Sequence, residues 1–155
     1  YRAIGEIADR VVVMAYDYSY KESAPGPVAP LWWVEDVTDY LVSIIPREKL
    51  LLGMPTYGYD WPRNKPGTTV TAAKLESLRY QYGLSEQFDY ASMSPHYTYV
   101  DNNGVKHDIW LENEQSLSEK YRVAQEHNLG GVSFWRIGNG FTALYKILAE
   151  NAVNK

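Results

Sequence analysis

The sequence contains no cysteine among its 155 residues, which excludes disulfides, thiolate metal sites and a cysteine nucleophile. No apolar run approaches the roughly 20 residues that a membrane-spanning helix needs, so we expect no membrane span. Basic residues are in the minority, with a net charge of −4, and no basic patch stands out, which argues against a nucleic-acid partner. The three histidines are far apart and the glycines form no phosphate-binding pattern, so we expect no metal ion and no cofactor.

The sequence also lacks an initiator methionine and a recognisable signal peptide. It opens instead on a helix-like pattern, with Ile4, Ile7 and Ala8 at helical spacing. We therefore expect the chain to be a piece of a longer protein. Its length and its 45% apolar content are nevertheless enough for one domain with a real core.

Aromatic residues are abundant, with 14 tyrosines and 5 tryptophans. One interpretation is an aromatic-rich core and surface. The other is a sugar-binding cleft, because flat rings stack on the apolar faces of sugars and tyrosine hydroxyls bond to sugar hydroxyls. Composition alone leaves both interpretations open.

The stretch from Arg10 to Tyr18 organises the chain. Its first part, 11–15, is a continuous apolar run, which predicts a strand buried on both faces in a parallel sheet. Tyr16 and Asp17 follow where such a strand ends, and α/β folds handle their ligands at that end. An ordinary exit from a strand into a loop has the same pattern, so both readings stand on this stretch alone.

Apolar runs at 49–55 and 132–135 predict two further parallel strands, each again followed by aromatic or charged residues. Apolar residues at helical spacing predict helices over 37–45, 117–124 and 141–148. Alternation of strand and helix is typical of right-handed βα units. Because three strands leave two open sheet edges, we expect either a larger sheet or barrel, or self-association of the chain through these edges.

The segment 62–110 breaks this rhythm. Thr71 is a candidate N-cap for a helix that Gly83 would end. Residues alternate in polarity on both sides of an Asn-Gly turn at 103–104, which predicts a hairpin. We interpret 62–110 as a small α+β insertion.

A capping box, Ser116-Leu-Ser-Glu119, predicts the start of the next helix. Glu112 and Glu114 come shortly before it. We expect both carboxylates to sit in solvent and to favour the helix N-terminus, rather than to act as an acid–base pair.

Three motifs together resemble glycoside hydrolase family 18, the chitinase-like enzymes. They look like the ends of the sixth, seventh and eighth strands of that family's barrel: Met14-x-Tyr16-Asp17, Gly53-x-Pro55-x-Tyr57-Gly58 and Gly130-Gly131-x-x-x-x-Trp135. The detail around 109–113, Lys120 and 135–138 looks most like the bacterial branch that includes spore-germination and cortex-lytic glycosidases.

The resemblance implies an α/β fold, the C-terminal part of a (β/α)8 TIM barrel, with the α+β insertion between the last two strands. Residues 1–61 would supply the sixth βα unit and the start of the seventh. Residues 62–110 would be the insertion, and 111–155 would supply a barrel helix, the last strand and the C-terminal helix.

The resemblance also implies hydrolysis of β-1,4-linked N-acetylglucosamine polymers, chitin or peptidoglycan, by a substrate-assisted retaining mechanism. In that mechanism the acetamido oxygen of the sugar attacks C1, so the enzyme must hold this group in line. Tyr16 would donate a hydrogen bond to the acetamido oxygen, and Asp17 would hold sugar hydroxyls. The family's acidic motif D-x-x-D-x-D-x-E, whose last Glu is the general acid, does not occur in this chain. We therefore expect the chain alone to be inactive.

Further substrate contacts are implied by the same resemblance. Trp135 would form the floor of the pocket, Met14 would pack beneath the sugar and Tyr57 would line the cleft. Trp33 and Trp61 are candidate stacking platforms further out. Asp17 has an alternative role as a loop-ordering carboxylate.

Three functions stay open from the sequence. The chain is part of a glycosidase, part of a non-catalytic glycan-binding module of the same fold, or an unrelated α/β piece with an aromatic core. For the first two we expect a bacterial cell-envelope, spore or extracellular location. The choice between chitin and peptidoglycan, and between endo and exo cleavage, also stays open.

Overall fold

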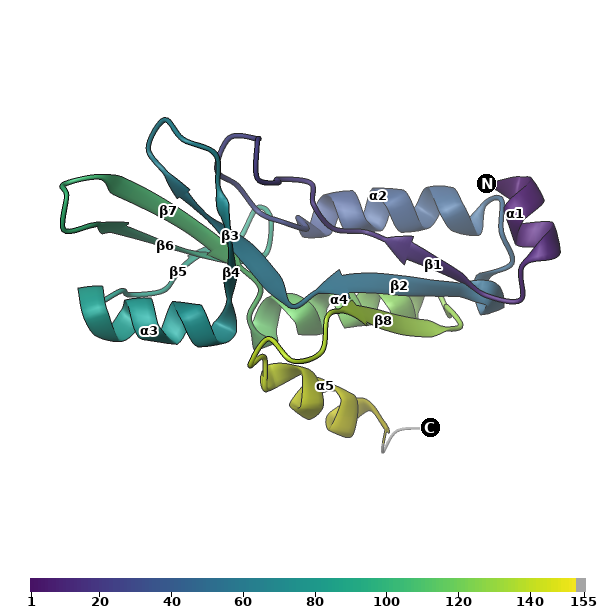
Figure 1. Cartoon of the computed structure of the whole chain (residues 1–155). Helices are drawn as coiled ribbons and strands as arrows, with labels where there is room; N and C mark the ends of the chain where they lie inside the picture. The colour runs from purple at the N-terminus through teal and green to yellow at the C-terminus, as the bar shows by residue number, and fades with distance from the viewer. Residues whose placement is uncertain (153–155) are drawn as a thin grey trace.

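A computed structural model describes residues 1–152, in which two sheets are joined end to end (Figure 1). The first sheet is parallel and has the order β1-β2-β8, formed by β1 (Val11–Met14), β2 (Leu50–Pro55) and β8 (Gly131–Trp135). All three strands coincide with the apolar runs of the sequence. Residues 153–155 of the expected unit 111–155 lie outside the described residues.

Helices cover one side of this sheet. The chain begins with α1 (Arg2–Ile7), and α2 (Leu31–Val42) and a short 3-10 helix, η1 (Arg47–Lys49), connect β1 to β2. Helix α4 (Glu114–Glu126) packs against β2, β8, α2 and α5 (Ala143–Ala152). Their shared core contains aliphatic side chains that are almost fully buried, among them Val34, Leu52, Met54, Leu117 and Ile147.

The prediction that β1 is buried on both faces is wrong. Val11 and Val13 pack against the buried cluster of Leu41, Ile45 and Leu50. Val12 and Met14, which point to the other face, are 48% and 70% exposed. Successive side chains of a strand point to opposite faces, and the described residues leave the second face of β1 uncovered.

The second sheet is antiparallel and has the order β4-β3-β7-β6-β5. Its strands are β3 (Tyr57–Pro62), β4 (Thr68–Thr71), β5 (Gln87–Asp89), β6 (Ser94–Val100) and β7 (Lys106–Leu111). Only Thr56 separates β3 from β2, and Figure 1 shows one running into the other. The sheet therefore begins at Tyr57, before the boundary at 62 that the sequence suggested, because 57–62 pairs with β7 and β4.

Local signals in this region are confirmed. Thr71 caps α3 (Ala72–Tyr82), since its hydroxyl accepts a hydrogen bond from the Lys74 amide at 3.3 Å. Gly83 ends α3 in the left-handed conformation, with φ of 67°. The predicted hairpin joins β6 to β7, with the Asp101 amide donating to the Val105 carbonyl at 2.9 Å.

The capping box of α4 lies three residues earlier than the sequence suggested. Asn113 is the N-cap, and its side chain accepts from the Ser116 amide at 2.9 Å. The Ser116 hydroxyl accepts from the Asn113 amide at 2.9 Å in return. Ser116 is thus the third residue of the helix rather than its cap, because Asn113 offers the better placed acceptor.

Glu112 does not sit in solvent, which corrects the second expectation for this region. Its carboxylate accepts from the Lys120 ammonium group at 2.9 Å, and the two side chains are 2% and 1% exposed. Glu114 is partly exposed and pairs with Lys146 at the surface. The buried pair ties the end of β7 to the middle of α4.

Candidate functional site

Asp17 lies just beyond β1 and connects the two sheets. Its carboxylate oxygen Oδ1 accepts hydrogen bonds from the hydroxyls of Tyr57, at 2.5 Å, and Tyr59, at 3.0 Å. Both tyrosines belong to β3, where alternate side chains point to the same face. Asp17 has a φ of 61°, a left-handed conformation that aspartate tolerates better than most residues. Two tyrosines some forty residues later in the sequence thus hold the Asp17 carboxylate.

The two phenols remain hydrogen-bond donors at neutral pH. Burial, together with the negative charge of Asp17, raises the pKa of Tyr57 far above its ordinary value. The same causes raise the pKa of Tyr59 to about 12. Both rings are almost buried and meet edge to face, with centroids 5.7 Å apart.

Tyr16 stands beside this pair. Its ring lies edge-on to Tyr57, with centroids 6.3 Å apart, and burial followed by the charge of Asp17 raises its pKa. Gly53 makes room for the ring, because a Cβ there would lie 3.2 Å from Tyr16 Cε1 and 2.5 Å from the Val13 carbonyl oxygen. Gly53 of β2 therefore leaves the space that the Tyr16 ring, just after β1, occupies.

Trp135 ends β8 and is 58% exposed. Its carbonyl accepts from the Thr56 amide at 2.9 Å, and the Thr56 hydroxyl donates to the Arg136 carbonyl at 2.5 Å. Thr56 is fully buried at the junction of the two sheets. These contacts fix the backbone that carries the indole at the same end of the parallel sheet as Asp17.

Asp17, Tyr57 and Trp135 line one cavity of about 320 Å³. Sequence reasoning had chosen these three, and the structure brings them together. The other lining residues were missed: Tyr59, Thr69, Thr71, Arg136 and Asn139. Only Tyr59 had a usable signal, because it follows Tyr57 at the spacing that a strand requires. The cavity combines an aromatic wall with one carboxylate, one guanidinium group and several neutral hydroxyl and amide groups.

Three predicted substrate contacts lie elsewhere. Met14 and Trp33 line a separate apolar groove of about 560 Å³ between β1 and α2, and Trp33 also packs against Tyr18. Trp61 is 1% exposed and packs beside Tyr59, so it offers no ring face to a sugar. Its role as a stacking platform is therefore wrong. Trp61 lies on the same face of β3 as Tyr57 and Tyr59, but its indole is covered, with Gly67 packed directly against it.

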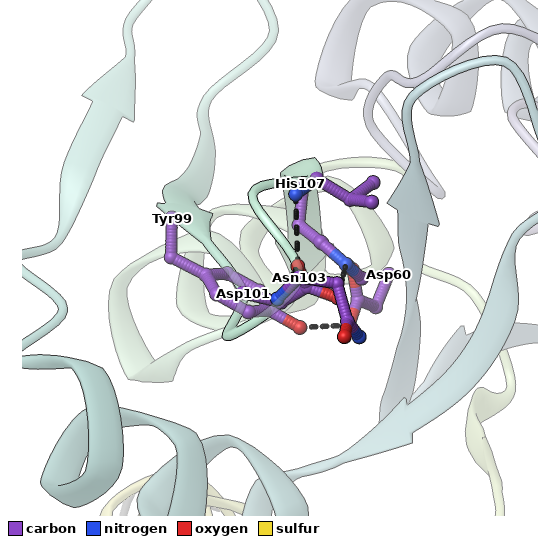
Figure 2. Close-up of polar contacts among 6 residues, drawn as sticks. Asp60, Tyr99, Asp101, Asn103 and His107 are labelled. Carbon is purple, nitrogen blue, oxygen red and sulfur yellow. Dashed lines mark hydrogen bonds and ion pairs between the residues drawn. The ribbon is translucent and has the colours of Figure 1, made fainter.

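A polar network fixes β3 from its other face (Figure 2). The Asp60 carboxylate accepts from the Tyr99 hydroxyl at 2.8 Å and lies 2.7 Å from Nδ1 of His107. The other ring nitrogen of His107 is 3.7 Å from the Asp101 carboxylate, which also accepts from the Asn103 amide at 2.9 Å. This network joins three strands beneath the tyrosines of the cavity.

Within residues 1–152, no helix combines the length and the apolar character that crossing a membrane requires. The same residues contain no group of three or more His, Asp or Glu side chains arranged to hold a metal ion.

The family model for glycosyl hydrolases family 18 matches residues 1–140. The chain belongs to glycosyl hydrolase family 18. Among the curated relatives, the cortical fragment-lytic enzyme of Bacillus anthracis is 33% identical over 156 residues, covering 97% of this chain and 36% of that enzyme. The chain therefore spans little more than a third of the length of this curated relative.

Solved structures also resemble the chain along nearly its whole length. The spore cortex-lytic enzyme SleL of Bacillus cereus is 33% identical, with a TM-score of 0.91 over 97% of this chain and 36% of that one. A chitinase from Chromobacterium violaceum ATCC 12472 is 32% identical, with a TM-score of 0.92 over 99% of this chain and 49% of that one. These likenesses indicate a fold derived from the TIM barrel, with mixed α/β content.

Proposed function

We propose that this chain is the C-terminal part of a glycoside hydrolase that cleaves β-1,4-linked N-acetylglucosamine polymers. Strands β1, β2 and β8 would be the sixth, seventh and eighth strands of the barrel, and the sheet from Tyr57 to Leu111 would be its insertion. The observation that carries the proposal is the shared cavity of Asp17, Tyr57 and Trp135 at one end of the parallel strands. Active sites of TIM barrels lie at that end.

The side chains supply what a substrate-assisted mechanism needs. Tyr16 donates its hydroxyl to the acetamido oxygen, which attacks C1, and the family's Glu outside this chain protonates the leaving oxygen. Asp17 accepts from the sugar, Trp135 supports the ring of the distorted sugar and Tyr57 lines the cleft. Met14 lies outside this cavity, on the exposed face of β1, and would pack beneath the sugar from there. The chain's task is positioning, which can lower the barrier substantially without any acid in the chain itself.

We infer peptidoglycan of the spore cortex and chitin as the two candidate polymers, because the relatives include both a cortical fragment-lytic enzyme and a chitinase. The cortex substrate would bring a spore-associated location. The second candidate function is a non-catalytic glycan-binding module of the same fold, because the cavity of Asp17, Tyr57 and Trp135 could hold a glycan without any acid.

Incubation of the full-length protein with soluble N-acetylglucosamine oligomers and with cortex fragments tests the proposal. We expect cleavage with retention of the anomeric configuration, which NMR of the first products detects. Residues 1–155 alone should produce no cleavage under the same conditions. Binding without cleavage by the full-length protein would favour the module, and neither binding nor cleavage would refute the glycan function.

A further inference from the structure

Both hydrogen bonds to Asp17 fall on the same carboxylate oxygen. Tyr57 and Tyr59 donate to Oδ1, and no residue in the part of the chain that the structure describes donates a hydrogen bond to Oδ2. Asp17 is exposed and lines the cavity. The pair of phenols therefore turns one oxygen inward and leaves the other available to a ligand.

Tyr59 is built into the structure more firmly than a surface tyrosine. It is 8% exposed, and its ring touches Tyr57 on one side and Trp61 on the other, with centroids 5.7 and 5.4 Å away. The backbone of β3 pairs with both β4 and β7 at this point, through Thr69 and Trp110. The hydroxyl of Tyr59 consequently has little freedom to leave Asp17.

The residue after Tyr59 anchors the strand from the opposite face. Asp60 is held by Tyr99 and His107 (Figure 2), so the two neighbouring residues of β3 are each tied to a different polar group. Because β3 is held on both faces, the Tyr59 hydroxyl has a well-defined position. This rigidity is what a residue that orients a carboxylate requires.

We propose that Tyr59 is a positioning residue, which holds the Asp17 carboxylate in the orientation that receives an N-acetylglucosamine unit. It acts through Asp17 and makes no chemical step of its own. The inference rests on the proposed glycan function. It assigns to the antiparallel sheet a direct part in ligand recognition at the end of the parallel sheet.

Calorimetric titration of the full-length protein with the trimer (GlcNAc)3 tests this role. Tyr59→Phe keeps the ring and its packing but removes the hydroxyl. We expect about fivefold weaker binding, the size of one ordinary hydrogen bond, because Tyr57 still donates to the same oxygen. Tyr97→Phe is the matched control. Tyr97 is also buried and donates to a carboxylate, Glu86 at 2.5 Å, but lies on β6 outside the cavity. The Tyr97→Phe variant should bind (GlcNAc)3 as tightly as the wild type does.

A double-mutant cycle separates positioning from a general loss of stability. If Tyr59 acts through Asp17, then Tyr59→Phe should cause no further loss of affinity in an Asp17→Ala background, which has no acceptor for the Tyr59 hydroxyl. Unchanged affinity of Tyr59→Phe, an equal loss in Tyr97→Phe, or the same fivefold loss in the Asp17→Ala background would each overturn the inference while the glycan function stands. Failure of the wild type to bind would overturn both.

Discussion

Replacement of Lys120 by methionine should destabilise the protein strongly. The ammonium group lies 2.9 Å from the Glu112 carboxylate and 3.4 Å from the Ser116 carbonyl oxygen, inside the core around α4. Methionine fills a similar volume but leaves the Glu112 carboxylate buried without its partner. Breaking one side of a buried ion pair costs about 3–5 kcal/mol. For a protein of this length, that corresponds to a loss of about 6–20 °C in melting temperature.

Thermal and urea unfolding followed by circular dichroism measure this loss. The double variant Glu112→Leu/Lys120→Met should recover most of the stability, because an apolar pair of similar volume is about as stable as a buried ion pair. Lys146→Met serves as the surface control, since the Lys146–Glu114 pair is 57% and 46% exposed. A Lys120→Met variant as stable as this control, or a double variant no better than the single one, would refute the reasoning.

Three further predictions follow from other parts of the fold. Gly58→Ala should destabilise by about 1–3 kcal/mol or more in thermal unfolding, because the new Cβ would lie 1.8 Å from the Trp110 carbonyl oxygen; unchanged stability would contradict the β3–β7 pairing. Burial lowers the pKa of His127, but its hydrogen bonds, chiefly to Asp39, outweigh this and raise the pKa above 6.5. The contact therefore contributes its full stability below pH 6.5, and the contribution is lost as the pH rises through the folded-state pKa. In urea unfolding, Asp39→Asn should lower the free energy of unfolding more at pH 5.5 than at pH 8.5. Because Asp39 is well exposed, solvent screening keeps the difference below about 1 kcal/mol. Residues 1–155 alone should self-associate through the open edges of β1 and β8, and a compact monomer in sedimentation velocity would contradict this.

The elements that the sequence could predict depend on neighbours along the chain. The apolar runs of β1, β2 and β8 mark strands whatever their partners, and Thr71 and Gly83 mark the ends of α3 through their own hydrogen bonding and backbone conformation. The same is true of the Asn-Gly turn between β6 and β7. Local chemistry is sufficient for these features, so one sequence is enough to find them.

The position of β3 could not be found in this way. The sequence alone predicts that residues 57–61 belong to the barrel unit of β2, because the strand is defined by pairing with β7, some fifty residues later. Without that register, the sequence predicts a free aromatic ring at Trp61, although the side chain is only 1% exposed. The hydrogen bond from Tyr59 to Asp17 depends on the same register and was missed for the same reason.

The predicted environment of Glu112, beside α4, was wrong. Two glutamates beside a helix start usually lie in solvent, but Glu112 meets Lys120 inside the core. The spacing of Glu112 and Lys120 does not reveal their burial, which depends on how the end of β7 packs against α4. Asn113 and Ser116 form a capping box from residue types other than the usual Ser or Thr and Glu or Gln, whereas the nearby Ser-x-x-Glu sequence matches the usual pattern.

The central claim is that the cavity of Asp17 and Trp135 binds N-acetylglucosamine glycans, and the most direct test is titration of the full-length protein with (GlcNAc)3 before and after Trp135→Ala. The ring is 58% exposed, so its removal should leave the melting temperature unchanged while affinity falls at least about tenfold, as for other aromatic anchors. Tyr80→Ala, which changes an aromatic ring that is 96% exposed on α3, should bind like the wild type. Equal affinity of Trp135→Ala and the wild type would contradict the assignment of this cavity as the glycan site.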